Sequence, residues 1–90
     1  MASLFELGNV FATRGAVRYC EVHNISILDL IVRHAAGDWG DLCLADRKSN
    51  DDAVSNGDRI LSAYKFSVGS VWVVTEADRG TTTVLLPDEY

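Results

Sequence analysis

The sequence predicts an α+β fold in which two or three helices pack on one face of a three-stranded antiparallel meander. Two observations carry this prediction: apolar residues recur at helical spacing over residues 14–56, and apolar and polar residues alternate from Arg59 onward. A chain of 90 residues that is 48% hydrophobic supports one core. We therefore expect a single domain over residues 1–90.

The N-terminal part is predicted to hold a short extended segment and a first helix. Gly8 indicates a turn before an extended segment at residues 10–12. Thr13 is a suitable N-cap for a helix over residues 14–23, and Asn24 ends it. The residues that this helix turns inward are Ala16, Val17 and Cys20.

Two further helices are expected before the strands. Ser26 precedes Asp29 by three residues, which resembles a capping box, and the helix that follows stops at Gly37. Its inward residues, at helical spacing, are Ile27, Leu30, Ile31 and His34. A weaker third helix spans residues 46–56 and ends at Gly57. Its inward residues are Asn50, Ala53 and Val54.

The C-terminal part is predicted to form the meander, with strands at residues 59–66, 71–76 and 81–86 and four-residue loops at 67–70 and 77–80. One face then carries Ile60, Ser62, Tyr64, Phe66, Val71, Val73, Thr75, Thr82, Val84 and Leu86. The other carries Leu61, Ala63, Lys65, Trp72, Val74, Glu76, Thr81, Thr83 and Leu85. The first face is richer in large apolar groups, so we expect the helices there.

Charge and composition limit the classes of partner. Thirteen acidic residues against eight Lys and Arg give a net charge of −5, which disfavours direct binding to nucleic acid and favours a protein partner with a basic surface. The chain has no apolar run of ~20 residues and no signal-peptide pattern at its start, so we expect a cytoplasmic protein that does not enter the membrane.

The candidate binding surface comprises an acidic stretch, two tryptophans and two residues at a hairpin tip. Residues 38–58 hold six aspartates against one Arg and one Lys, a local net charge of −4. Such a stretch is either a solvated helix face, with Arg47–Asp51 and Lys48–Asp52 pairs, or a surface that imitates a row of phosphates. The candidate partner-binding residues are Asp38, Trp39, Asp41, Asp46, Asp51, Asp52, Trp72, Asp78 and Arg79.

The aromatic and hairpin candidates each have a structural alternative. Trp39 between acids has the composition of a binding hot spot, but it is also suited to closing the core from a loop. Trp72 either joins a partner surface or is covered by a loop or by residues 4–12. Asp78 and Arg79 lie at a hairpin tip, where Asp78 is expected to accept backbone hydrogen bonds and Arg79 to pair with Glu76.

Catalytic and metal chemistry find little support. The soft metal ligands are Cys20, His23, His34 and Cys43, and their spacing matches no compact zinc pattern. We expect reduced core thiols and a histidine near a helix end, since a Cys–His nucleophile pair has no support beyond the presence of these residues. The sequence contains none of the common nucleotide-binding, hydrolase or metalloprotease motifs. We therefore expect a protein that is not an enzyme and needs no metal or cofactor.

Four stretches resemble a group of short bacterial proteins encoded on plasmids and other mobile elements. They are GDWGDL at 37–42, GDRILSAY at 57–64, VWVVTEADR at 71–79 and TTVLLPDEY at 82–90. The resemblance covers residues 4–90 and is specific over 37–90. The resemblance implies a mobile-element setting and no mechanism. Because small acidic proteins from mobile elements often block host defences, we expect an inhibitor of a host defence complex, of anti-CRISPR or anti-restriction type, and the acidic stretch at 38–58 is the surface that would imitate nucleic acid. The alternative is a structural or regulatory module for plasmid maintenance, homodimeric through a sheet edge or Trp72.

Overall fold

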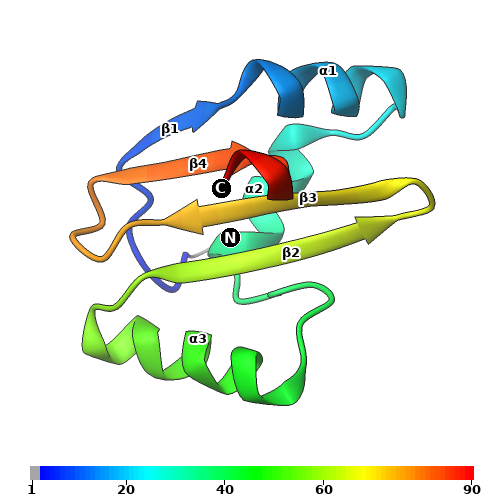
Figure 1. Ribbon diagram of the computed structural model, residues 1–90. Coiled ribbons are helices and arrows are strands. Elements are labelled where there is room, and N and C mark those ends of the chain that lie inside the picture. Colours follow the sequence, from blue (N-terminus) through cyan, green and yellow to red (C-terminus); the bar gives the residue numbers. More distant parts are fainter. Residues whose placement is uncertain (1–2) are drawn as a thin grey trace.

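The computed structural model describes residues 3–90 and is an α+β fold built on one four-stranded sheet (Figure 1). The elements in chain order are β1 (Asn9–Ala12), α1 (Arg14–Val22), α2 (Ile27–Ala35), α3 (Leu44–Asn56), β2 (Ile60–Phe66), β3 (Gly69–Thr75), β4 (Thr81–Leu85) and the short 3-10 turn η1 (Pro87–Glu89). The strand order across the sheet is β1-β4-β3-β2. The α+β class and the three helices agree with the sequence prediction.

The sheet is mixed, which corrects the predicted three-stranded antiparallel meander. β2, β3 and β4 do form an antiparallel meander, but β1 adds a fourth strand that runs parallel to β4. The extended segment at the N-terminus was expected, whereas its partner was not. Four residues carry too little alternation to indicate a pairing. By lying beside β4, β1 pairs N–H and C=O groups that β4 would otherwise leave open.

The first hairpin is tighter than predicted, yet every strand residue keeps its predicted face. β3 begins at Gly69, so a two-residue turn replaces the expected four-residue loop, and Phe66 pairs with Gly69. The predicted loop of four residues and the observed turn of two residues differ by an even number. Because side chains alternate with a period of two, that difference leaves the faces of β2 and β3 unchanged.

Local side-chain chemistry starts and ends the helices where the sequence indicates. Thr13 caps α1, accepting a hydrogen bond from the backbone N–H of Ala16 at 3.0 Å. Ser26 caps α2 in the same way, accepting from the backbone N–H of Asp29 at 3.3 Å. Gly57 ends α3 in the left-handed conformation with φ +78°.

Two of the helices cover the predicted face of the sheet. α1 and α2 pack on it through a buried cluster that comprises Ala16, Cys20, Leu30, Tyr64, Val71, Val73 and Val84. α3 instead lies alongside β2, at the edge of the sheet (Figure 1), which corrects the expectation that all helices share one face. Its buried residues are only Asn50 and Ala53, so its inward side is too small and too polar to cover a sheet face.

The opposite face of the sheet carries no α-helix within residues 3–90. Figure 1 is drawn from this side, and the segment that crosses in front of β3 and β4 is η1 with the last residue of the chain. This face is partly covered, since Ala63, Val74 and Leu85, which lie on it, are buried.

One further property follows from helix length and composition. Over residues 3–90, none of the helices is sufficiently long and apolar to span a lipid bilayer.

Candidate protein-binding surfaces

The acidic segment is built into the edge of the sheet. The backbone of residues 39–41 pairs with Ala63 of β2: the N–H of Asp41 donates to the Ala63 carbonyl at 2.7 Å, and the Ala63 N–H donates to the Trp39 carbonyl at 3.1 Å. The Asp41 carboxylate accepts from the backbone N–H of Lys65 at 2.8 Å. Asp41 therefore satisfies backbone groups that an edge strand would otherwise expose.

Asn50 of α3 closes the next position on the same edge. Its side-chain amide donates to the Leu61 carbonyl at 2.7 Å, and its amide oxygen accepts from the Leu61 N–H at 3.2 Å. One side chain thus reproduces the two hydrogen bonds that a neighbouring strand would make. Together with the contacts of residues 39–41, this closes the outer edge of β2 along most of its length.

Three other aspartates also have partners within the chain. Asp38 accepts from Arg33 at 2.6 Å, and this bond holds the pKa of the Asp38 carboxyl below its ordinary value. Asp51 accepts from the indole N–H of Trp39 at 2.9 Å. Asp52 lies 3.7 Å from Lys48, which confirms that predicted pair.

Arg47 corrects the other predicted pair. Its guanidinium donates to the carbonyls of Leu42 and Gly40, at 3.0 and 3.2 Å, and not to Asp51. Among the contacts of residues 3–90, Asp46 alone of the six candidate aspartates has neither a hydrogen bond nor an ion pair through its side chain. The carboxylates remain exposed, but most of them hold the loop and α3 in place.

Trp39 is a core residue, which corrects its assignment to the partner surface. Its side chain is 4% exposed and belongs to a second buried cluster with Phe5, Ala53 and Ile60. The Phe5 ring stacks on the indole with centroids 6.1 Å apart. An indole this deeply buried cannot contact a rigid partner, so the structure favours the alternative in which Trp39 closes the core from a loop.

The hairpin tip between β3 and β4 also serves the fold. Asp78 accepts from the backbone N–H of Gly80 at 2.8 Å, as expected of a turn aspartate. Arg79, at φ +60°, donates to the carbonyls of Asp58 and Ala53 at 2.7 and 2.8 Å and thereby ties the tip to the end of α3. The predicted Arg79–Glu76 ion pair is wrong, because Arg79 reaches only the backbone carbonyl of Glu76.

The open face of the sheet centres on Trp72. The Tyr90 ring meets the indole edge to face, with centroids 5.6 Å apart and an interplanar angle of 66°. Arg59 donates to the Tyr90 hydroxyl and lies 3.4 Å from the Glu76 carboxylate. Trp72 is half-buried and Tyr90 is 57% exposed. Tyr90, and not a loop or residues 4–12, is the side chain that stacks against Trp72.

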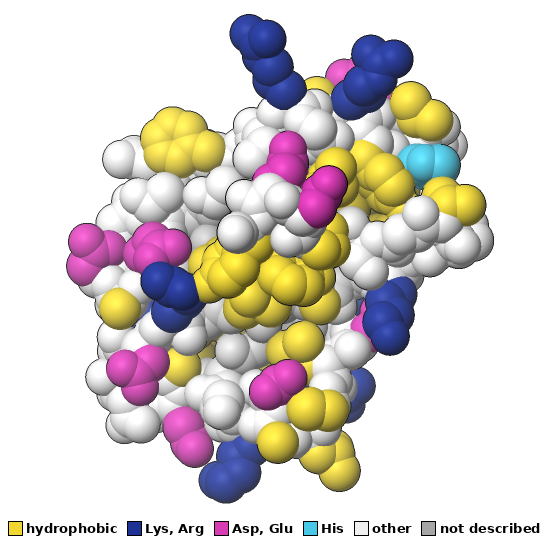
Figure 2. Space-filling model, in the orientation of Figure 1, with side chains coloured by type: hydrophobic (Ala, Val, Ile, Leu, Met, Phe, Trp, Pro, Cys, Tyr) yellow, Lys and Arg dark blue, Asp and Glu magenta, His cyan; other side chains and the backbone are white. Residues whose placement is uncertain are grey.

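Figure 2 shows the same face with its side chains. Hydrophobic side chains gather near the middle, and acidic and basic side chains surround them. Sequence reasoning identified Trp72 but missed Tyr90 and Arg59 as its neighbours. Tyr90 lies 18 positions from Trp72 beyond a strand and a turn, so alternation along a strand carried no signal for it.

A buried polar chain crosses the other side of the sheet. The ring nitrogens of His34 contact the Ser62 hydroxyl at 2.6 Å and the Thr75 hydroxyl at 2.9 Å. Thr75 continues the chain to the Thr82 hydroxyl at 2.7 Å, and Thr82 donates to the carbonyl of Leu7 at 2.7 Å. Desolvation lowers the pKa of His34 to about 4. The four side chains of this network have no exposed surface, and their hydrogen bonds join α2 to three strands within the core.

The potential metal ligands do not gather. Cys20 is buried in the core, where burial raises the pKa of its thiol, while Cys43 is exposed at the start of α3. His34 uses both ring nitrogens within the core. Over residues 3–90, no three or more His, Cys, Asp or Glu side chains are grouped so that they could hold a metal ion.

Comparisons of the chain with protein-family models, with curated proteins and with solved structures found no match. The resemblance to short proteins of plasmids and other mobile elements stays a prediction.

Proposed function

We propose that this chain is a non-catalytic protein-binding module that engages its partner through the open face of the sheet, around Trp72, Tyr90 and Arg59. One observation supports the proposal: Tyr90 contacts both Trp72 and Arg59 on the sheet face that no α-helix covers within residues 3–90. Trp, Tyr and Arg are the residue types most enriched among the hot spots of protein interfaces.

The arrangement suits binding because it is already ordered. Trp72 projects from the middle of β3, opposite Leu85 of β4, and Arg59 anchors the Tyr90 ring through its hydroxyl. Side chains that are held before a partner arrives lose less conformational entropy on binding. The exposed part of Tyr90 then supplies a large apolar contact next to a polar group, as aromatic residues do at interfaces.

Charge favours a basic partner. Asp88 and Glu76 are exposed and lie next to or within this surface, and the whole chain has a net charge of −5. Such a field attracts basic protein surfaces and increases the rate of encounter. We propose a subunit of a host defence complex, of CRISPR or restriction type, as the partner; inhibition then follows when the module covers a surface that the subunit needs for nucleic acid.

The acidic segment remains the competing interface. Asp46 and Asp52 lie on the exposed side of α3, and replacing them with Asn removes charge without disturbing the edge contacts of Asp41. This double variant therefore tests the acidic mimic separately from the aromatic surface.

The experiment is capture of proteins from a host lysate, together with an inhibition assay on any defence complex that is captured. We expect Trp72→Ala and Tyr90→Ala to weaken capture by about 30-fold, as at a hot spot, and Leu44→Ala to leave it unchanged. Leu44 is the matched control, because it is an apolar side chain that is 82% exposed on α3, away from the open face.

Two results would overturn the proposal. If capture survives both aromatic variants and is lost with the Asp46→Asn/Asp52→Asn double variant, the acidic segment is the interface. If no defence subunit is captured by the wild-type chain, the defence setting is wrong. Thermal melts of each variant show whether a loss of capture reflects a loss of fold.

A further inference from the structure

The two edge strands of the sheet, β1 and β2, differ in how well their backbone groups are covered. The edge at β2 is closed by residues 39–41 and by Asn50, as described above. The edge at β1 has no such cover: all four of its residues are exposed, and the strand contains neither a charge nor a proline. Proteins usually protect an edge strand with such devices or by keeping it very short, and β1 is limited only by its length of four residues. Its exposed Val10 and Phe11 therefore form an edge at which another short strand can pair.

The register of the sheet shows which groups of β1 are available. The N–H of Asn9 donates to the carbonyl of Gly80 at 3.0 Å, and that of Thr13 donates to the carbonyl of Val84 at 2.9 Å. Odd-numbered residues of this segment therefore direct their backbone groups toward β4. By alternation, the N–H and C=O groups of Val10 and Ala12 point away from the sheet.

We propose that β1 pairs antiparallel with β1 of a second copy of this chain, around a two-fold axis that passes between the two Phe11 residues. In this register Val10 of each copy lies opposite Ala12 of the other, and the four outward N–H groups of the dimer donate to four outward carbonyls. The two Phe11 side chains, each 57% exposed in the single chain, become a directly opposed cross-strand pair. The two sheets join into one continuous sheet.

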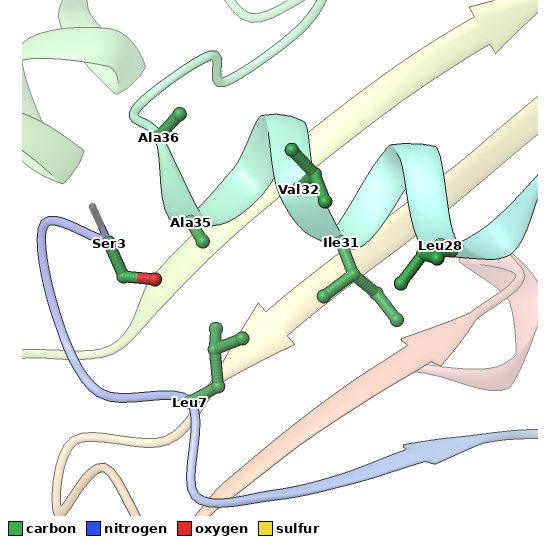
Figure 3. A pocket seen from close by; sticks show the side chains of 7 residues that line it. All are labelled: Ser3, Leu7, Leu28, Ile31, Val32, Ala35 and Ala36. Atoms are coloured by element: carbon green, nitrogen blue, oxygen red, sulfur yellow. The ribbon is translucent and has the colours of Figure 1, made fainter. Parts of the chain in front are cut away.

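The helix side of this edge is apolar as well. A pocket of about 240 Å³ lies between α2 and the segment that leads into β1, lined mainly by Leu7, Leu28, Ile31 and Val32 (Figure 3). In Figure 3 the side chain of Leu7 points toward Ile31 of α2. Leu28 is 68% exposed next to it. Val10 lies in register with Thr82, whose side chain is on the helix side, so Val10 of the second copy would extend the same apolar surface.

Charge favours a second copy as the occupant. The segment before β1 carries an exposed acid, Glu6. Helix α1 carries two exposed bases, Arg14 in its first turn and Arg18 one turn later, and they outnumber the Glu89 carboxylate that Thr13 holds at the start of α1. Antiparallel pairing about Phe11 brings the segment that leads into β1 of one copy next to the start of α1 of the other. The acidic end of each edge thus meets the basic end of the other, twice in one dimer, and a two-fold axis satisfies both contacts with the same surface.

The test is light scattering or sedimentation of the purified chain over about three decades of concentration. The interface is small, so we expect a dimer that dissociates on dilution. Phe11→Glu sets two carboxylates directly opposite each other and removes the aromatic pair, and it should raise the dimer dissociation constant about tenfold or more. Leu44→Glu makes the same charge change on α3 and should leave the constant unchanged.

A charge exchange tests the predicted orientation. Glu6→Arg and Arg14→Glu should each weaken the dimer, whereas the double variant should restore it. Glu6→Arg is informative because it makes the net charge of the chain less negative, which by itself would favour association. A monomer at every concentration, equal effects of Phe11→Glu and Leu44→Glu, or a double variant as weak as the single ones would overturn the proposal. A folded monomer that binds an extended peptide at β1 would assign the edge to another partner.

Discussion

Acidification should destabilise this fold through His34, whose uncharged ring is sealed in the core. The side chain has no exposed surface, and both ring nitrogens contact hydroxyl groups. Burial lowers its pKa from 6.5 to about 4, so the folded protein resists the proton that the unfolded chain accepts readily. The free energy of unfolding is therefore highest above the unfolded pKa and falls as pH decreases from 6.5 toward about 4.

The size of the effect follows from the shift. Each unit of pKa difference corresponds to about 1.4 kcal/mol, so His34 should remove about 3 kcal/mol of stability across this interval. The carboxyl groups with lowered pKa, Asp38 and Glu89, act in the same direction but at lower pH, because their ordinary values are 3.8 and 4.5. Between pH 6.5 and 4.5 the slope should come mainly from His34.

Urea unfolding monitored by circular dichroism, repeated at a series of pH values, measures this slope. His34→Gln keeps an amide donor and acceptor in the core but does not titrate, so its free energy of unfolding should be lower overall and nearly flat over the same interval. His23→Asn is the matched control: it removes the exposed histidine at the end of α1, so a pH series on this variant separates its contribution from that of His34. Parallel curves for the wild type and His34→Gln would refute the reasoning.

Three further outcomes concern the closed edge and the hairpin tip. Asn50→Ala should cost about 1–3 kcal/mol and lower the melting temperature, since it leaves the N–H and C=O of Leu61 unpaired at a partly buried position; an unchanged melt would show that water replaces the amide. Gly40→Ala should destabilise the fold far more than Gly57→Ala, although both glycines have φ +78°. A Cβ at Gly40 would lie 2.1 Å from a backbone oxygen of β2, whereas a Cβ at Gly57 would meet nothing within 4 Å. Similar melting temperatures for the two variants would contradict this. Arg79→Lys keeps the positive charge but should lower the midpoint of urea unfolding. Two different guanidinium nitrogens bond the carbonyls of Asp58 and Ala53, and the single nitrogen of Lys would have to reach both. An unchanged midpoint would mean that the charge alone suffices.

The elements that sequence reasoning identified are those that short-range chemistry controls. Thr13 and Ser26 mark helix starts because their side chains accept hydrogen bonds from free backbone N–H groups, and Gly57 marks a helix end because it adopts the left-handed conformation. Each residue does so in the structure. The faces of the meander were likewise predictable, because alternation has a period of two and survived a change of two residues in the turn at 67–68.

The buried network shows where this reasoning stops short. The sequence pattern predicted that His34 points inward and that Ser62, Thr75 and Thr82 lie on the helix-facing side of the sheet. All four side chains of the network were therefore predicted on the correct sides. Which hydroxyl meets which nitrogen depends on the relative position of α2 and the strands. That position is set by the packing of the whole core and not by any local run of residues.

By itself the sequence determined the α+β class, the helix ends and the faces of β2, β3 and β4, since these follow from periodicity and capping within a few residues of one another. Only the tertiary structure decided that β1 lies beside β4, that α3 closes the β2 edge through Asn50, and that Trp39 lies in the core. These features join segments that are distant in the sequence. They arise because backbone groups at a sheet edge and apolar surface in a loop must be satisfied by whichever segment the complete fold brings near.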